Sequence, residues 1–287
     1  MGRVTLRIDD LTVPGPHGPV PVRVYRADDA GAGGSGARAG AGSGSGSAGV
    51  VWAHGGGFQW GDLDMPEADW VARAFASRGI HVISVDYRLA SPSVHYPVPS
   101  DDVEAALAWT RAHAASLGID PDRIVLAGAS AGGNLAAGVA LRVAATAAAP
   151  RALFLAYPTL HAVQSAPSES LRALLDANPE ADRFGPDAVR TMYEGYLGGP
   201  VDGAPVFAVP GLATADDVRS LPPVLIVTGE ADELRVSAED FARTLGAAGV
   251  PVQISLEPGT EHGHLNRPEQ PAAARTIARV TDWIATF

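Results

Sequence analysis

Short apolar runs alternate with longer helix-like stretches along most of the chain. The runs are continuous, which is typical of strands buried on both faces; they lie at 49–53, 81–86, 124–127, 152–156, 224–228 and 252–256. The helix-like stretches lie at about 67–78, 101–117, 131–146, 238–248 and 271–286. Two more strand-like runs, 4–8 and 20–25, come first. This order predicts an α/β protein with a mostly parallel sheet covered by helices on both faces.

Two segments depart from this alternation. Every residue from 31 to 49 except Arg38 is glycine, alanine or serine. Such a run cannot bury enough apolar surface to offset its backbone entropy, so we expect a flexible loop inside a single domain of residues 1–287. Residues 158–220 lack a clear strand and have helix-like pieces at about 169–176 and 186–197. We expect them to form a helical cap insertion over one end of the sheet.

The stretch at 101–117 carries helix boundary residues at both ends. Ser100 can cap its start, and Asp101 and Asp102 lie where the helix dipole is positive. Gly118 can end it in a left-handed conformation. We therefore expect one helix between Ser100 and Gly118.

Composition excludes several classes of protein. Lysine and arginine total 21 against 32 aspartates and glutamates, a net charge of −11, which argues against binding nucleic acid or anionic membranes through bulk charge. The chain has no cysteine, so disulfides, thiolate nucleophiles and zinc–sulfur sites are excluded. The N-terminus has no apolar run of signal-peptide length, and no apolar run in the sequence is long enough to span a membrane. We expect a cytoplasmic protein without nucleic-acid or membrane partners.

One serine stands in a setting typical of a nucleophile. Gly128-Ala129-Ser130-Ala131-Gly132 is the chain's one match to G-x-S-x-G, and it joins an apolar run to a helix-like stretch. A nucleophile on such a sharp strand-to-helix turn needs small neighbours, because the strand and helix backbones approach closely there. The alternative is a helix start rich in small residues that Ser130 merely caps.

Consecutive glycines follow another predicted strand, in the sequence His54-Gly55-Gly56-Gly57-Phe58. Glycines allow backbone N–H groups to point at one ligand oxygen without clashes from Cβ atoms. Alone this could be an ordinary loop. Together with the serine turn, it predicts part of an oxyanion hole.

These motifs together resemble a known family. The sequences His-Gly-Gly-Gly-Phe at 54–58, Asp-Tyr-Arg-Leu-Ala at 86–90 and Gly-Ala-Ser-Ala-Gly-Gly-Asn-Leu-Ala at 128–136 resemble those of hormone-sensitive-lipase-like esterases, which have the α/β-hydrolase fold. Leu-Pro-Pro at 221–223, the run at 229–235 and Gly-Thr-Glu-His-Gly at 259–263 follow in the family's order. The resemblance extends from about residue 18 to the C-terminus.

The resemblance implies a catalytic triad in which Ser130 is the nucleophile, His262 the base and Asp232 the acid that orients the base. The order of serine, aspartate and histidine along the chain is that of α/β-hydrolases. The residues alone leave His264 as a rival to His262, since both lie in a glycine-bounded loop after a late strand. We interpret the adjoining Glu261 as a solvated loop charge.

The residues alone also leave rivals for the acid. Glu230 and Glu233 lie beside Asp232, just after the run at 224–228. Asp232 is preferred because it matches the family motif. Asp86 and Arg88 match a family motif too, and we interpret them as a structural pair that braces the glycine loop.

The resemblance further implies an oxyanion hole formed by backbone amides. These amides belong here to Gly56, Gly57 and Ala131. Four residues are candidates for the acyl or alcohol pocket, with ordinary core packing as the alternative for each: Phe58, Trp60, Tyr157 and Leu160.

The function implied is that of a serine carboxylesterase that hydrolyses small or short-acyl esters through an acyl-enzyme, with no metal or cofactor. One alternative is a related acyl hydrolase that uses the same chemistry to cleave a lactone, carbamate or amide in natural-product tailoring. Another is a non-catalytic receptor for a small ligand, but receptors of this family lose the catalytic histidine. The expected partner is a small-molecule ester, and a homodimer remains an option.

Overall fold

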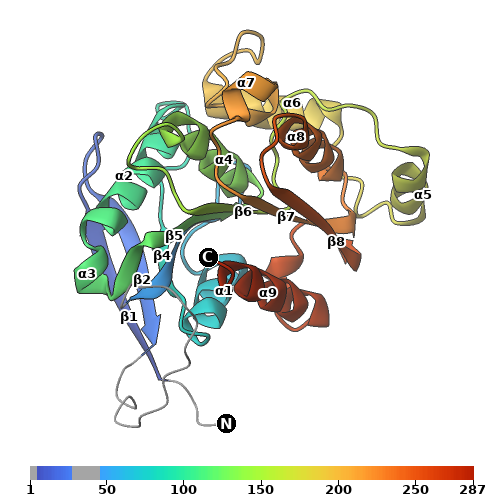
Figure 1. Cartoon of the computed structure of the whole chain (residues 1–287). Coiled ribbons are helices and arrows are strands. Elements are labelled where there is room, and N and C mark those ends of the chain that lie inside the picture. Colours follow the sequence, from blue (N-terminus) through green and yellow to red (C-terminus); the bar gives the residue numbers. More distant parts are fainter. Residues whose placement is uncertain (1–4, 28–45) are drawn as a thin grey trace.

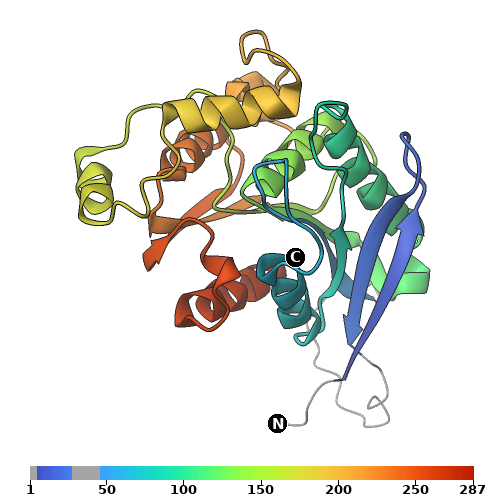
Figure 2. The ribbon, with the colours of Figure 1, turned by 180° about the vertical axis from the view of Figure 1, so that it is seen from behind.

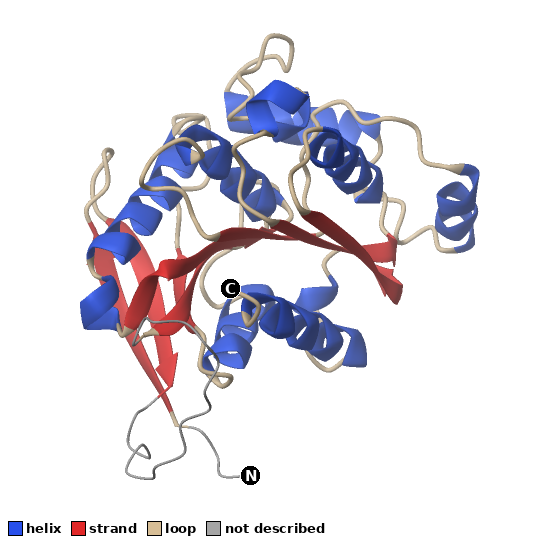
Figure 3. Ribbon diagram, in the orientation of Figure 1, coloured by secondary structure: helices blue, strands red, loops and turns tan. Residues whose placement is uncertain are grey.

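The computed structural model describes residues 5–27 and 46–287. Its centre is an eight-stranded sheet in the order β1-β2-β4-β3-β5-β6-β7-β8 (Figure 1, Figure 3). The strands are β1 Leu6–Val13, β2 Val20–Ala27, β3 Ser47–Ala53, β4 His81–Val85, β5 Ile119–Ala129, β6 Ala152–Ala156, β7 Val224–Ala231 and β8 Val252–Glu261. All neighbours from β4 to β8 run parallel, whereas β1 and β2 form an antiparallel hairpin at one edge (Figure 2).

Helices cover both faces of this sheet (Figure 3). The helices of the described residues are α1 Pro66–Ala76, α2 Val98–Ala112, α3 Ala114–Leu117, α4 Ala131–Val143, α5 Glu169–Ala177, α6 Pro186–Leu197, α7 Ala215–Val218, α8 Arg235–Ala247 and α9 Pro271–Ile284, with short 3₁₀ turns η1 Pro210–Leu212 and η2 His264–Asn266. Helices α1 and α9 pack on one face of the sheet, and α2, α4 and α8 pack on the other. The predicted α/β architecture is confirmed.

The single helix expected between Ser100 and Gly118 differs from the prediction at its start, and it is divided in two, since α2 ends at Ala112 and α3 begins at Ala114. The first helix, α2, already begins at Val98, with Pro97 before it and Pro99 in its first turn. Prolines are tolerated there because the first N–H groups of a helix have no acceptor within the helix. Ser100 caps nothing, and its Oγ lies 2.7 Å from the hydroxyl of Tyr196. Gly118 ends α3 with a φ of 71°, as expected.

The glycine-, alanine- and serine-rich run also needs a correction. Residues 31–45 of the predicted loop lie outside the described residues. The final part is not loop, because Ser47 and Gly49 belong to β3, where they pair with Ile119 of β5 and His81 of β4. Sheet pairing on both sides overrides the low strand propensity of these small residues.

Residues 158–220 hold α5, α6, η1 and α7 and lie on the side of the sheet that carries α4 and α8 (Figure 1). The side-chain amide of Asn134 in α4 connects this segment to the core. It donates to the carbonyl oxygen of Ala208 over 2.9 Å and accepts from the hydroxyl of Tyr193 over 2.8 Å. Both partners come from the 158–220 segment, so buried polar bonds attach it to α4.

Arg88 does not pair with Asp86, contrary to the prediction. Its guanidinium and its backbone N–H both bind the buried carboxylate of Asp102, and its guanidinium also donates to the carbonyl oxygen of Pro19 over 3.1 Å. Asp102 was expected only as an acid in the first turn of a helix. It is buried instead, and a buried carboxylate needs a cationic partner such as Arg88.

The described residues form no helix that is long and apolar enough to cross a membrane.

Candidate active site

The parallel strands bring the predicted site residues together at the carboxyl ends of the strands. The glycine loop that begins at His54 follows β3, Ser130 follows β5, Asp232 follows β7 and His262 follows β8. The carboxyl ends of parallel strands meet at the same edge, which is where open α/β sheets bind ligands. The strand order therefore collects residues from distant parts of the sequence.

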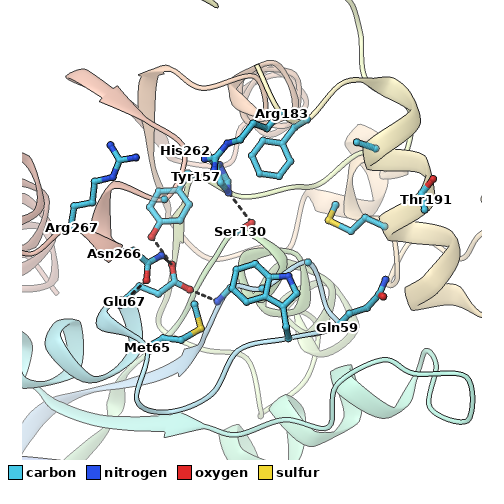
Figure 4. Close-up of a pocket in the computed structure, with 18 residues that line it drawn as sticks. Gln59, Met65, Glu67, Ser130, Tyr157, Arg183, Thr191, His262, Asn266 and Arg267 are labelled. Carbon is cyan, nitrogen blue, oxygen red and sulfur yellow. Dashed lines mark hydrogen bonds between the residues drawn. The ribbon is translucent and has the colours of Figure 1, made fainter. Parts of the chain in front are cut away.

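Ser130, His262 and Asp232 form a continuous chain of hydrogen-bonding distances. Oγ of Ser130 lies 3.0 Å from Nε2 of His262 (Figure 4). Nδ1 of the same ring lies 3.0 Å from Oδ2 of Asp232. When Nδ1 carries the ring proton, Nδ1–H donates a hydrogen bond to Asp232, and Nε2 is free to accept one from the serine hydroxyl. This arrangement can activate a serine as a nucleophile.

Ser130 has a backbone conformation that side chains rarely adopt. Its φ is 51° and its ψ is −117°, and such strain costs on the order of 1–3 kcal/mol. The turn closes tightly around it: a Cβ at Gly132 would overlap the carbonyl oxygens of Ala53 and His54, and one at Gly128 would overlap the carbonyl of Gly132. Only glycine fits at these two positions.

The carboxylate of Asp232 is completely buried. Besides the imidazole of His262, it accepts from the backbone N–H of Leu234 over 2.9 Å and from the hydroxyl of Thr228 over 3.3 Å. Its rivals face elsewhere: Glu230 accepts from the N–H of Gly259 over 2.9 Å, and Glu233 accepts from a backbone N–H of the 158–220 segment.

The rival histidine faces away from the serine. His264 is buried, and its Nε2 lies 2.9 Å from the hydroxyl of Thr276. Burial lowers its pKa to about 4, so the ring is neutral at physiological pH. Both His262 and His264 pack edge-on against the ring of Tyr157.

The glycine loop after β3 follows a left-handed path. Gly56 and Gly57 have φ values of 123° and 56°, and the carbonyl of Gly56 accepts from the N–H groups of Gln59 and Trp60, each over 3.1 Å. Gly56, Gly57 and Ser130 line the same pocket. Ala131 is the first residue of α4, where N–H groups have no acceptor within the helix.

This pocket has a volume of about 600 Å³, within the usual range for small-molecule sites. Trp60 and Tyr157 line it, and the side chain of Trp60 is 62% exposed. Phe58 and Leu160 do not line it, contrary to expectation. Both are buried in the core, where the ring of Phe58 stacks on Tyr196 with 4.2 Å between centroids.

Several residues that line the pocket were not predicted from the sequence. They include Met65, Glu67, Arg183, Phe184, Met192 and Asn266. Glu67 is buried with 1% exposure, and its carboxylate accepts from the backbone N–H of Gly55, from the hydroxyl of Tyr157 over 2.7 Å and from the amide of Asn266 over 3.1 Å (Figure 4). The sequence does carry one signal for the burial of Glu67, its spacing, because Glu67 lies on the same face of α1 as the buried Val71 and Phe75.

Comparisons with known proteins show the family to which this chain belongs. A family profile described as the alpha/beta hydrolase fold matches residues 50–266. Carboxylesterase NlhH of Mycobacterium tuberculosis is 42% identical over 234 residues, which are 80% of this chain and 70% of that protein. Ethyl acetate hydrolase of Pseudomonas putida is 34% identical over 221 residues, 75% of this chain and 65% of that protein.

A solved structure has the same fold. The hyperthermophilic esterase from the archaeon Pyrobaculum calidifontis superposes with a TM-score of 0.81 at 31% identity, covering 98% of this chain and 85% of that one. The chain belongs to the α/β-hydrolase fold family, and its predicted resemblance to the hormone-sensitive-lipase-like esterases is confirmed.

Proposed function

We propose that this protein is a serine carboxylesterase that hydrolyses small, short-acyl esters, with Ser130, His262 and Asp232 as its catalytic triad. The observation that carries the proposal is the chain of contacts from Ser130 through His262 to Asp232, of which Ser130 and His262 line the pocket. Esterases at 42% and 34% identity support ester hydrolysis as the reaction.

Acylation begins when Oγ of Ser130 attacks the carbonyl carbon of the ester. His262 accepts the serine proton on Nε2, and Asp232 stabilises the imidazolium through Nδ1–H. The tetrahedral intermediate collapses by breaking the bond to the alcohol oxygen, which takes the proton from Nε2. The alcohol leaves, and the acyl group remains on Ser130.

Deacylation repeats these steps with water. His262 takes a proton from the water as the oxygen attacks the acyl carbon, and then returns it to Oγ of Ser130. The products are a carboxylic acid and free enzyme. No metal or cofactor takes part in either half of this proposed reaction.

The oxyanion of each tetrahedral intermediate would be bound by the N–H groups of Gly56, Gly57 and Ala131. Such donors matter because they bind the charge that develops in the transition state. Glu67 has a supporting role in this proposal. Its carboxylate holds the N–H of Gly55 and thereby fixes the start of the glycine loop.

A hydrolase is favoured over a small-ligand receptor, because His262 occupies the base position within reach of Ser130. Lactone, carbamate and amide substrates use the same attack on a carbonyl carbon and remain an alternative. Ethyl acetate, the substrate named for the relative from Pseudomonas putida, has the small size that we propose here.

Some further expectations remain proposals. Residues 158–220 would act as the cap of a single domain, since Arg183, Phe184 and Met192 of this segment line the pocket. A cytoplasmic location, the absence of nucleic-acid and membrane partners, and a homodimer are predictions from the sequence alone.

The test is turnover of p-nitrophenyl acetate and butyrate by the wild type and by Ser130→Ala. We expect the wild type to hydrolyse both esters and the variant to lose several orders of magnitude in kcat, roughly the range of triad knockouts. Circular dichroism should show an unchanged fold. A folded variant that keeps more than about a tenth of the activity would place the nucleophile elsewhere.

A further inference from the structure

The segment that joins α5 to α6 is attached at one end to Glu233. The backbone N–H of Phe184 in this segment donates to Oε2 of Glu233 over 2.5 Å. Glu233 is only 8% exposed and directly follows Asp232 in the chain. The position of Phe184 is therefore fixed by the loop that carries the proposed catalytic acid.

The other end of the same segment is attached to Glu261. The side-chain amide of Asn178 donates to Oε1 of Glu261 over 2.8 Å, and Arg267 donates to the second carboxylate oxygen over 3.1 Å. Glu261 directly precedes His262. Glu261 is therefore an anchor for the segment between α5 and α6, and not the solvated loop charge that the sequence suggested.

The aromatic ring of Phe184 packs against the proposed base. Its centroid lies 4.6 Å from that of His262, with the planes at 63°. Phe184 and His262 also line the same pocket. The two carboxylate anchors thus hold an aromatic side chain beside the ring that exchanges protons with the substrate.

The chemistry of acylation identifies which part of the substrate lies there. His262 gives its proton to the oxygen of the departing alcohol, so that oxygen must come within hydrogen-bonding distance of Nε2. The carbonyl oxygen points to the backbone amides instead. The alcohol group is therefore the part of the ester that extends along His262 and meets Phe184.

We propose that Phe184 selects esters of aromatic alcohols, and that Glu233 and Glu261 are positioning residues that hold it in place. The proposal rests on the serine esterase function proposed above. An aromatic ring in the alcohol can make an edge-to-face or offset contact with Phe184 that a small alkyl group cannot make.

Two acetate esters isolate this effect. Benzyl acetate and ethyl acetate both release an alcohol whose oxygen is bonded to a saturated carbon, and both form the same acetyl-enzyme, so deacylation is common to the two. Their ratio of kcat/KM therefore reports selection of the alcohol during acylation. A pair that differs only in the acyl group, ethyl acetate and ethyl butyrate, serves as the substrate control.

The variants remove the ring of Phe184 and the contacts that anchor it separately. Phe184→Ala should lower the benzyl-to-ethyl ratio by roughly three- to tenfold, the range expected for one aromatic pair. Glu233→Ala and Asn178→Ala should lower it in the same direction. Glu233→Gln should keep the wild-type ratio, because its amide oxygen can still accept from the N–H of Phe184. Glu230→Ala is the matched control, since Glu230 binds Gly259 and not this segment.

The ratios of kcat/KM in these variants support or overturn the proposal for Phe184. A lowered benzyl-to-ethyl ratio in Phe184→Ala, Glu233→Ala and Asn178→Ala, with an unchanged acetate-to-butyrate ratio, supports the proposal. The proposal is overturned if these three variants keep the wild-type benzyl-to-ethyl ratio, or if that ratio falls equally in Glu233→Gln and Glu233→Ala. It is also overturned if the acetate-to-butyrate ratio changes as much as the benzyl-to-ethyl ratio. If Glu233→Ala does not fold, Phe184→Ala and Asn178→Ala decide. Failure of the wild type to hydrolyse any ester would instead reject the proposed function.

Discussion

The hydroxyl of Tyr157 lies 2.7 Å from the buried carboxylate of Glu67. This bond joins the end of β6 to the first turn of α1, and the second carboxylate oxygen binds the N–H of Gly55 at the start of the glycine loop. Tyr157 also packs edge-on against His262, with 5.0 Å between ring centroids. One buried acid thus connects the glycine loop to the surroundings of the proposed base.

Loss of the Glu67 carboxylate should reduce kcat more than it changes KM. In Glu67→Ala the N–H of Gly55 loses its acceptor, and the proposed oxyanion amides of Gly56 and Gly57 next to it lose their fixed orientation. These amides act mainly in the transition state. We expect kcat to fall by about 10- to 100-fold, less than the loss of a whole oxyanion donor.

Glu67→Gln is the matched control for this change, since its amide oxygen can still accept one N–H. Steady-state kinetics with p-nitrophenyl acetate provide the measurement, and thermal unfolding separates the effect from lost stability. A rise in KM at unchanged kcat in Glu67→Ala would assign Glu67 to substrate binding.

The two neighbouring histidines should respond in opposite ways to substitution. His262→Ala should abolish turnover nearly as completely as loss of Ser130, because His262 is the proposed base and, among the described residues, its ring is the side chain that bonds Oγ of Ser130. His264→Phe should keep most of kcat, since a phenylalanine ring can retain the edge contact with Tyr157. Single-turnover kinetics on both variants make the comparison. The reverse order of effects would assign the base to His264.

The buried His264 should make the fold less stable in acid. Burial lowers its pKa to about 4 from the 6.5 of an exposed imidazole. Between these values the unfolded chain binds a proton that the folded chain does not, so stability falls as the pH falls through this window. The loss from this one group should reach about 2 kcal/mol by pH 5.

His264→Phe tests this linkage, because phenylalanine does not titrate. Urea unfolding at pH 7.5 and pH 5 should show a smaller difference in unfolding free energy for the variant than for the wild type. His161 also has its pKa lowered to about 4 by burial, so part of the acid sensitivity should remain. An equal pH dependence in both proteins would contradict a neutral His264.

Short acyl chains should be preferred over long ones. The pocket holds about 600 Å³, and this volume must accept both the acyl and the alcohol group. We expect kcat/KM for p-nitrophenyl esters to be highest at acetate or butyrate, lower at octanoate and lowest at palmitate. The net charge of −11 also disfavours adsorption to an anionic interface. A maximum at palmitate would require a long acyl channel.

Local patterns in the sequence narrow the proposed triad to a few candidates, and the resemblance to the esterase family selects among them. Ser130 lies between a buried strand and a helix, and Asp232 and His262 directly follow late strands. Parallel pairing then collects strand ends at one edge, whatever their separation in the chain. Residues at such ends can be located from the order of apolar runs.

The pocket wall could not be predicted in this way. Phe58 lies one residue beyond the glycines, yet its φ of 68° directs the ring into the core against Tyr196. Phe184 reaches the site from a loop, where no periodic pattern reports what a side chain contacts. The spacing of Glu67 with Val71 and Phe75 indicates burial, but its partners Gly55 and Tyr157 come from distant parts of the sequence, and no local pattern reports them.

Mapping the adduct of a fluorophosphonate probe tests the central claim most directly, because this reagent modifies only an activated serine. The account predicts one adduct per chain, located on Ser130 by peptide mass spectrometry, absent from Ser130→Ala and formed at least about 100-fold more slowly in His262→Ala. An adduct on another serine, or no adduct on the folded wild type, would contradict the assignment of Ser130, His262 and Asp232 as a working triad.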